Sequence, residues 1–233
     1  MSDDLRIALV AEGPTDAILI TAALKAILPR SFVPTLLQPE ETLPKMGTGW
    51  CGVLKWCDAF RRRGDASLEE DPTLFRYDMI ILHIDADVAD MKYGDCGQEA
   101  SQLAVSTGWP SLPHPTECPP PQNAAQYLER CLLSWLGVAG RGARTVHCIP
   151  SKAVESWLCV AVRPVGDPLL TSVECRFDLA NKLASLPKGQ KVRKTKSDYQ
   201  AHASKLQPQW GRVRSACSQA AAFEAQVLAV PLP

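Results

Sequence analysis

Several features that mark particular protein classes are missing from this 233-residue sequence. It has no run of about 18 apolar residues, so we expect no membrane-spanning helix. Its acidic first residues contain no apolar core of a secretion signal. It has no Gly-x-x-x-x-Gly-Lys-[Ser/Thr] loop, so we do not expect the chain to hydrolyse ATP itself. These absences indicate a cytoplasmic protein that works away from membranes.

Zinc-knuckle spacing is also missing, although the chain has nine cysteines. No pair has the spacing of roughly two to four residues that zinc knuckles use. The number of cysteines is odd, and several, such as Cys131 and Cys159, lie within apolar stretches. We therefore predict reduced, mostly buried thiols.

The sequence has no net charge, but its charges are unevenly placed. Residues 1–100 hold 10 Lys and Arg against 17 Asp and Glu, whereas residues 101–233 hold 15 against 8. This asymmetry suggests an acidic centre beside a basic surface. Ordinary variation in surface composition would produce similar counts, so both interpretations stay open.

The most informative stretch is residues 80–87, Ile-Ile-Leu-His-Ile-Asp-Ala-Asp. Its apolar run is typical of a buried parallel strand, and it ends in two carboxylates, Asp85 and Asp87. On an extended backbone, side chains two residues apart point the same way. Their repulsion favours a divalent cation between them, because such ions take hard oxygen ligands. The alternative is a surface turn in which both side chains are solvated.

Another strand is predicted at residues 5–11, and it runs directly into Glu-Gly-Pro-Thr-Asp. The glycine and proline suit a tight turn into a helix, which Thr15 or Asp16 is expected to cap. Strand, turn and helix begin a βαβ unit. If the strands are parallel, Glu12 lies at the same sheet edge as Asp85.

The rest of the chain alternates between predicted strands and helices. Further strands are expected at residues 31–37, 77–84 and 143–149. Helices are expected at residues 17–28, 53–63, 98–105, 123–136, 151–162, 177–186, 199–206 and 210–228. Six prolines make residues 108–122 a long loop. The strand pattern stops after Pro164, so we predict an α/β domain at 1–165 with this Pro-rich insertion, and a helical extension at 166–233.

Two segments resemble the motifs of the Toprim family, which includes topoisomerases, bacterial primases, OLD-type nucleases, the recombination protein RecR and the 5S ribosomal RNA maturase. They are Val-Ala-Glu-Gly-Pro-Thr-Asp at residues 10–16 and Ile-Asp-Ala-Asp at residues 84–87, each after a predicted strand. The resemblance covers roughly residues 5–160. It implies a Toprim-like Rossmannoid α/β fold, with a mainly parallel central sheet flanked by helices.

The resemblance also implies roles for individual residues. Glu12 would be the acid/base or metal-linked glutamate, and Asp85 and Asp87 would be ligands of Mg²⁺ or Mn²⁺. Residues 154–158, Val-Glu-Ser-Trp-Leu, further resemble RloB-type stand-alone Toprim-like proteins of bacterial defence loci. By likeness to OLD-type nucleases, Glu155 would serve a second metal. The alternative is an exposed helix glutamate.

A basic stretch near the C-terminal end is a candidate for contacts with nucleic-acid phosphates. Its members are Lys188, Lys191, Arg193, Lys194 and Lys196. A solvated loop is the alternative. Lys194 or Lys196 is a candidate for the cation that a nuclease needs near developing charge. We expect His83, Trp157 and Trp210 in the core, with His83 on the strand face opposite the acidic pair.

The function that the resemblance favours is a Mg²⁺-dependent nuclease, or a related phosphodiester-acting enzyme, that acts on DNA or RNA in bacterial anti-phage defence. By analogy with OLD-type nucleases, an ATPase would be a partner in trans. A homo-oligomer stays open. The alternative is a non-catalytic Toprim-like module that binds nucleic acid or a protein. The intact set of Glu12, Asp85 and Asp87 argues against it.

Overall fold

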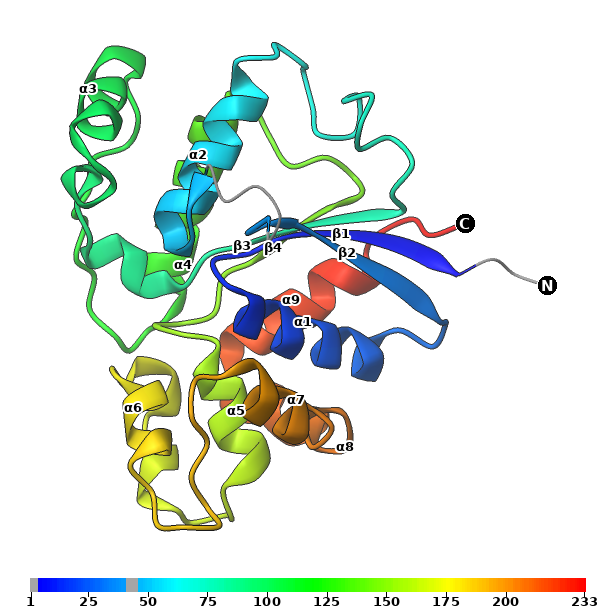
Figure 1. Cartoon of the computed structure of the whole chain (residues 1–233), viewed down its shortest axis with the longest axis vertical. Coiled ribbons are helices and arrows are strands. Elements are labelled where there is room, and N and C mark those ends of the chain that lie inside the picture. Colours follow the sequence, from blue (N-terminus) through cyan, green and yellow to red (C-terminus); the bar gives the residue numbers. More distant parts are fainter. Residues whose placement is uncertain (1–3, 41–45) are drawn as a thin grey trace.

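The fold is built on a parallel β-sheet (Figure 1). The computed structural model describes residues 4–40 and 46–233, and within them the sheet has four strands in the order β2-β1-β3-β4. The strands are β1 (Leu5–Val10), β2 (Phe32–Gln38), β3 (Met79–His83) and β4 (Thr145–Cys148). All neighbouring pairs are parallel. The predicted α/β class with a parallel sheet is confirmed, and its Toprim-like form stays a prediction.

Helices cover both faces of the sheet (Figure 1). One face carries α2 (Gly49–Arg61) and α4 (Gln122–Leu136), and the other carries α1 (Pro14–Ile27), α5 (Glu155–Val162), α8 (Leu206–Ala216) and α9 (Ser218–Leu228). The remaining elements are α3 (Gln98–Thr107), α6 (Leu179–Ala184), α7 (Lys196–Ala203), η2 (Ala86–Asp90), η3 (Tyr93–Cys96), η4 (Pro168–Leu170) and η5 (Val173–Cys175), where η denotes a 3-10 helix. Among the helices of the described ranges, none is both long and apolar enough to span a membrane.

The two-residue period of the strands produces two hydrophobic cores. In β1, Ile7 and Leu9 pack with α1, α8 and α9, whereas Ala8 and Val10 pack with α2 and α4. All four side chains are buried, which is why residues 7–10 of β1 form a continuous apolar run without alternation, after the exposed Arg6. The edge where the strands end is therefore held between two packed layers.

The predicted helix at 151–162 begins later than expected. Helix α5 starts at Glu155, and Ser151 does not cap it. Residues 151–154 form a turn in which Lys152 has a φ of 57° and the Val154 N–H is bonded to Asp85. The loop is thus held by the carboxyl end of β3, a contact that the local sequence does not reveal.

Two other local predictions are wrong. The helix expected at 210–228 is divided into α8 and α9, because Cys217 has an extended backbone between them. Neither Thr15 nor Asp16 caps α1, whose N-cap is Gly13 without a side-chain hydrogen bond. The side chain of Asp16 is consequently available for the sheet edge.

The C-terminal helices pack directly on α5. The ring of Trp157 in α5 lies 5.5 Å from that of Trp210 in α8 and 5.6 Å from that of Phe223 in α9, between ring centroids. Both tryptophans are buried, as predicted. Helices follow residue 165 as expected, and the domain boundary itself stays a prediction.

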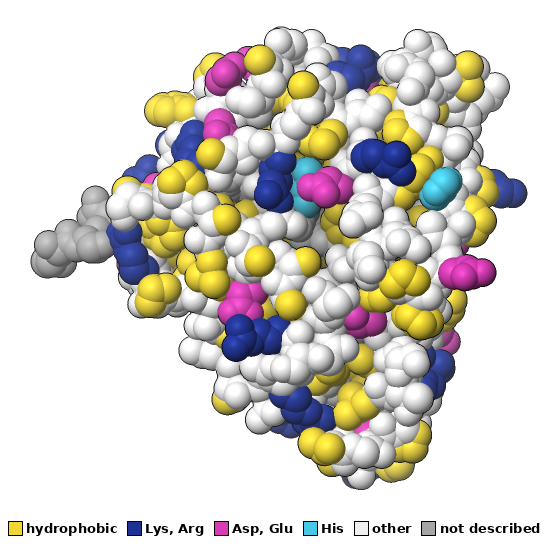
Figure 2. All heavy atoms as spheres, turned by 180° about the vertical axis from the view of Figure 1, so that it is seen from behind, with side chains coloured by type: hydrophobic (Ala, Val, Ile, Leu, Met, Phe, Trp, Pro, Cys, Tyr) yellow, Lys and Arg dark blue, Asp and Glu magenta, His cyan; other side chains and the backbone are white. Residues whose placement is uncertain are grey.

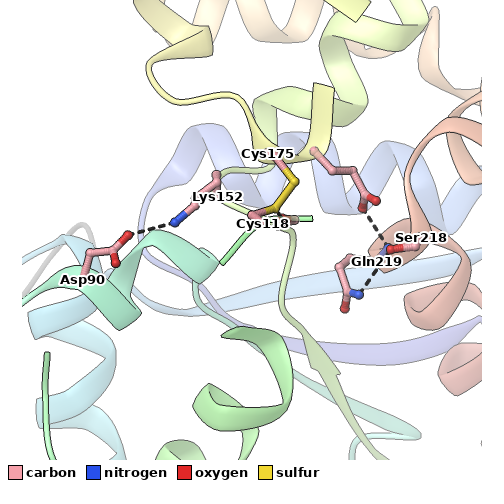
Figure 3. The surroundings of a disulfide bond; sticks show 8 residues. Asp90, Cys118, Lys152, Cys175, Ser218 and Gln219 are labelled. Atoms are coloured by element: carbon pink, nitrogen blue, oxygen red, sulfur yellow. Dashed lines mark hydrogen bonds and ion pairs between the residues drawn. A yellow bond between two sulfur atoms is a disulfide. The ribbon is translucent and has the colours of Figure 1, made fainter. Parts of the chain in front are cut away.

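Two disulfides correct the prediction of reduced thiols. Cys51–Cys96 joins α2 to the end of η3, and Cys118–Cys175 joins the Pro-rich loop to η5 (Figure 3). The partners are 45 and 57 residues apart, so the pairing depends on the fold and leaves no local spacing signal. The other five cysteines are free and buried, in agreement with the prediction.

Candidate active site

Glu12 and Asp85 meet at the carboxyl edge of the sheet, just after β1 and β3. The backbone N–H of Asp85 donates to Glu12 Oε1 over 2.7 Å. They lie together because neighbouring parallel strands end at one edge. The structure thus joins two residues that the sequence singled out, and their roles as ligands or catalysts stay predictions.

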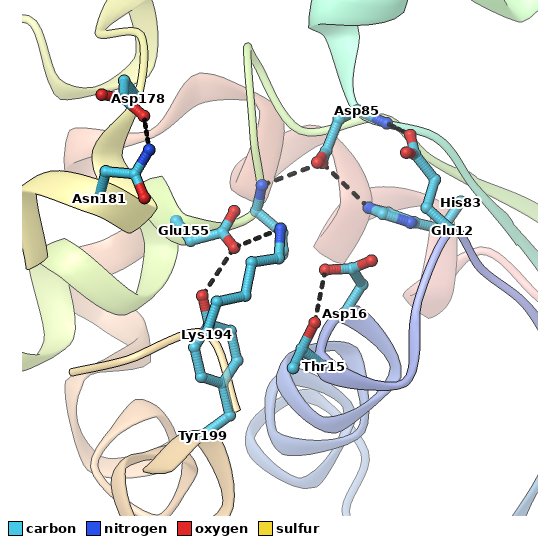
Figure 4. A network of polar contacts seen from close by, with 11 residues as sticks. Glu12, Thr15, Asp16, His83, Asp85, Glu155, Asp178, Asn181, Lys194 and Tyr199 are labelled. Carbon is cyan, nitrogen blue, oxygen red and sulfur yellow. Dashed lines mark hydrogen bonds and ion pairs between the residues drawn. The ribbon is translucent and has the colours of Figure 1, made fainter. Parts of the chain in front are cut away.

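Two further contacts hold the Asp85 carboxylate (Figure 4). Its Oδ1 accepts the Val154 N–H over 3.0 Å and lies 3.2 Å from His83 Nε2. His83 is fully buried, as predicted, but it faces Asp85, so its predicted opposite orientation is wrong. Residues i and i+2 of an extended chain lie on one side, which accounts for this contact. Burial lowers the pKa of His83, which favours a neutral ring that donates from Nε2.

Asp87 does not continue the strand, contrary to the expectation of an extended backbone. It lies in η2, after β3 has ended at His83. The chain turns there because the Asp87 N–H donates to the Lys152 carbonyl over 3.4 Å. Asp87 nevertheless stays close to Asp85, two residues before it in the chain. Burial, and then the charge of Asp85, raise the pKa of Asp87 to about 7.

Glu155 lies at the first position of α5 and is completely buried, so its interpretation as an exposed helix glutamate is wrong. Its Oε1 accepts the Tyr199 hydroxyl over 2.7 Å and lies 2.8 Å from Lys194 Nζ (Figure 4). Its Oε2 is buried and has no partner in the described chain. Burial opposes ionisation, but Lys194 and Tyr199 outweigh it and lower the pKa of Glu155.

Asp16 also belongs to this cluster of carboxylates, although from the sequence it was expected only as a helix cap. It lies in the first turn of α1, is 3% exposed, and faces the same space as Asp85 in Figure 4. Burial raises the pKa of Asp16 to about 6. The signal for it was present, because Asp16 closes the Glu-Gly-Pro-Thr-Asp motif, four residues after Glu12.

The cluster has an excess of negative charge. Burial, and then the charge of Asp85, raises the pKa of Glu12 well above its usual range. Burial, and then the charge of Glu155, raises the pKa of Asp85. These shifts have the same cause: ionised carboxylates are poorly solvated and repel one another. A bound cation would relieve both effects.

The donors fit a hydrated hard cation better than a closed cage. In the described ranges, no three His, Cys, Asp or Glu side chains converge as direct ligands of one ion. Glu155 Oε2 is a buried carboxylate oxygen without a partner in those ranges. Mg²⁺ usually keeps several waters and binds through one or two carboxylates. Glu12, Asp85, Asp87 and Glu155 are the carboxylates that would hold such an ion, and their role as metal ligands stays a prediction.

The basic stretch contributes one member to this site. Lys194 contacts Glu155, and although burial opposes its charge, Glu155 and Asp16 raise the pKa of Lys194. Arg193 and Lys196 are exposed and Lys191 is half-buried, so their role in nucleic-acid binding stays a prediction. On the face seen in Figure 2, Lys and Arg side chains are dispersed among acidic, apolar and uncharged ones.

Lys152 is a cation near the site that the sequence analysis missed. Its side chain is 7% exposed, and its Nζ lies 2.8 Å from Asp90 Oδ2. Its charge opposes the rise in the pKa of Asp87. No motif marks it, because its place depends on the turn between β4 and α5.

Comparison with known proteins identifies no relative. A scan against protein-family models, a search of curated proteins and a search of solved structures each found no match. The Toprim assignment therefore stays a prediction that rests on the two motifs and on the carboxylates at the sheet edge.

Proposed function

We propose that this chain is a Mg²⁺- or Mn²⁺-dependent nuclease, or a related phosphodiester-acting enzyme, of Toprim type. The observation that carries the proposal is the group of buried carboxylates beside Lys194, at the edge where β1, β3 and β4 end. Ligands of open α/β sheets bind at this edge. A role in bacterial anti-phage defence, with an ATPase partner in trans, belongs to the same proposal by analogy.

The chain's own residues suit the steps of phosphodiester hydrolysis. A bound Mg²⁺ supplies polarisation of the phosphate and a lowered pKa of the attacking water. Glu12, whose pKa is raised, accepts a proton at the sheet edge. Lys194 keeps its charge and stabilises negative charge that develops on the phosphate.

In this proposal, the groups that contact the Asp85 carboxylate hold it in position. The Val154 N–H and His83 both engage Oδ1, which fixes the carboxylate and directs its other oxygen to a ligand. A fixed ligand needs little reorganisation when substrate binds. His83 therefore acts through Asp85 and is not itself a catalytic residue.

A non-catalytic Toprim-like binding module is the second candidate. It is favoured by the raised pKa values of Asp16 and Asp87, because protons alone are able to neutralise such a cluster. A thermal melt with added Mg²⁺ or Mn²⁺ separates the two. A metal that binds the native state raises Tm by an amount that grows with the logarithm of its concentration relative to Kd, whereas a proton-neutralised module shows no such rise.

The decisive experiment is cleavage of single- and double-stranded DNA, ribosomal RNA and tRNA in Mg²⁺, Mn²⁺ or EDTA. Asp85→Asn and Asp87→Asn should abolish divalent-dependent cleavage while the fold is retained. Glu117→Gln removes an exposed carboxylate from the Pro-rich loop and should leave the rate unchanged. If the wild type cleaves none of these substrates with any candidate ATPase present, the proposal of an enzyme is wrong. If cleavage survives in both Asp variants, the assignment of the site is wrong.

A further inference from the structure

An exposed aromatic ring lies beside the acidic site. Phe177, between η5 and α6, is 57% exposed. Phe75 is also exposed, at 63%, but it precedes β3 and so lies toward the opposite end of that strand. Single exposed apolar side chains are common on protein surfaces, so what distinguishes Phe177 is the contact of its ring with a charged residue near the candidate site.

Lys152 links this ring to the carboxylates. Its Nζ lies over the Phe177 ring, 4.3 Å from the ring centroid, and 2.8 Å from Asp90 Oδ2. Asp90 ends η2, the short helix that carries Asp87. Lys152 has a φ of 57°, a conformation that is uncommon for a long side chain and is concentrated at functional sites.

The segment that carries Phe177 is fixed in place. Cys175 forms the disulfide with Cys118 (Figure 3), and Arg176 donates to two carbonyls of the preceding turn. Figure 4 shows Asp178, the next residue, at the border of the acidic site. A ring held in this way loses little conformational entropy when a ligand stacks on it.

We propose that Phe177 and Lys152 form a subsite for one unpaired nucleobase and its phosphate, so that single-stranded nucleic acid is the substrate class of the acidic site. This inference rests on the proposed phosphodiester chemistry. The exposed part of the ring stacks on a base, and such stacking tolerates any sequence because every base has a π face. The Lys152 ammonium has three donors, one of which Asp90 accepts, and in the proposed subsite another donor bonds to a phosphate oxygen.

Single strands are selected because their bases are free to leave the stack. Inside a duplex each base is covered by its neighbours and paired with its partner, so reaching Phe177 would require unstacking and unpairing. The ring therefore discriminates between the two forms without reading sequence.

The test measures, by fluorescence anisotropy, the binding of a labelled oligothymidylate to the full chain. It is carried out in EDTA and in Ca²⁺. Phe177→Ala should raise Kd roughly 5- to 150-fold, the usual contribution of one stacked base. Phe177→Trp should retain binding. Phe75→Ala removes a similarly exposed ring elsewhere and should leave Kd unchanged.

Abasic strands separate stacking from a general loss of structure. When bases are removed one at a time, one position should weaken wild-type binding as much as Phe177→Ala does. Phe177→Ala should be insensitive at that position, because the two changes remove the same contact. Identical abasic profiles for the two proteins, equal effects of Phe177→Ala and Phe75→Ala, or no binding by the wild type would overturn the subsite. A chain that binds as described but cleaves nothing retains the subsite and overturns the nuclease.

Discussion

Lys194 Nζ lies 2.8 Å from Glu155 Oε1, so the loop before α7 supplies a cation to a carboxylate at the start of α5. The Glu155 side chain is 1% exposed, whereas that of Lys194 is 48% exposed. The negative charge of the buried Glu155 is therefore balanced by a lysine at the protein surface. It follows that the C-terminal part of the chain completes the candidate site.

Lys194→Met should destabilise the protein and abolish cleavage, because it leaves the Glu155 charge buried without its cation. Breaking a fully buried pair costs about 3–5 kcal/mol. We expect about 1–3 kcal/mol here because Lys194 is half exposed and its charge is screened. Urea unfolding measures the loss. Lys191→Met, on the same loop, is the matched control, and equal losses for both variants would contradict the role of the pair.

Stability in metal-free buffer should fall as pH rises. In the folded protein the pKa of Asp16 is about 6 and that of Asp87 about 7, both above the ordinary value of 3.8. Between about pH 4 and pH 7 the folded state therefore binds more protons than the unfolded state. The stability that these protons provide is fully present below pH 4 and is lost as the pH rises through 7. Since a difference of one in pKa corresponds to about 1.4 kcal/mol, we expect the loss to be several kcal/mol.

The measurement is Tm in EDTA between pH 4 and pH 8. Asp87→Asn should flatten the profile, and Mg²⁺ should raise Tm most at pH 8, where the carboxylates are ionised. A profile that is flat in the wild type, or unchanged by Asp87→Asn, would contradict the assigned cause.

The backbone of the site could be predicted from the sequence. The apolar runs that form β1 and β3 have the length and composition of buried parallel strands, and each leads into a carboxylate. Parallel strands end at one edge, so the meeting of Glu12 and Asp85 follows from strand order alone. These predictions depended only on local periodicity and on topology.

The remainder of the site depends on contacts between distant segments. The sequence does not show that the turn at 151–154 docks on Asp85, or that Lys194 reaches Glu155. Asp87 leaves the strand because of hydrogen bonds to the segment after β4, which no local pattern encodes. The disulfides are of the same kind, since their geometry exists only after the fold has formed.

The basic stretch at residues 188–196 should account for part of the salt dependence of nucleic-acid binding. Replacing Lys191, Arg193 and Lys196 together with Ala, while Lys194 is kept for Glu155, should make the slope of log K against log salt less negative. The change expected is about 0.7–0.9 for each phosphate contact removed. The control triple Lys25→Ala, Lys55→Ala and Lys205→Ala removes the same charge from exposed positions elsewhere. Equal slopes in the two triples would show that the loop is only solvated surface.

The Cys118–Cys175 disulfide should be necessary for single-strand binding, because it fixes the segment that carries Phe177. The double variant Cys118→Ser, Cys175→Ser should lose about 2–4 kcal/mol of stability in urea and should bind oligothymidylate as weakly as Phe177→Ala. Removing Cys51–Cys96 in the same way should cost stability but leave this binding intact, since that bridge joins α2 to η3. Thiol titration of the denatured, unreduced wild type should detect the five free cysteines. Detection of all nine, or equal binding losses for the two double variants, would contradict the prediction.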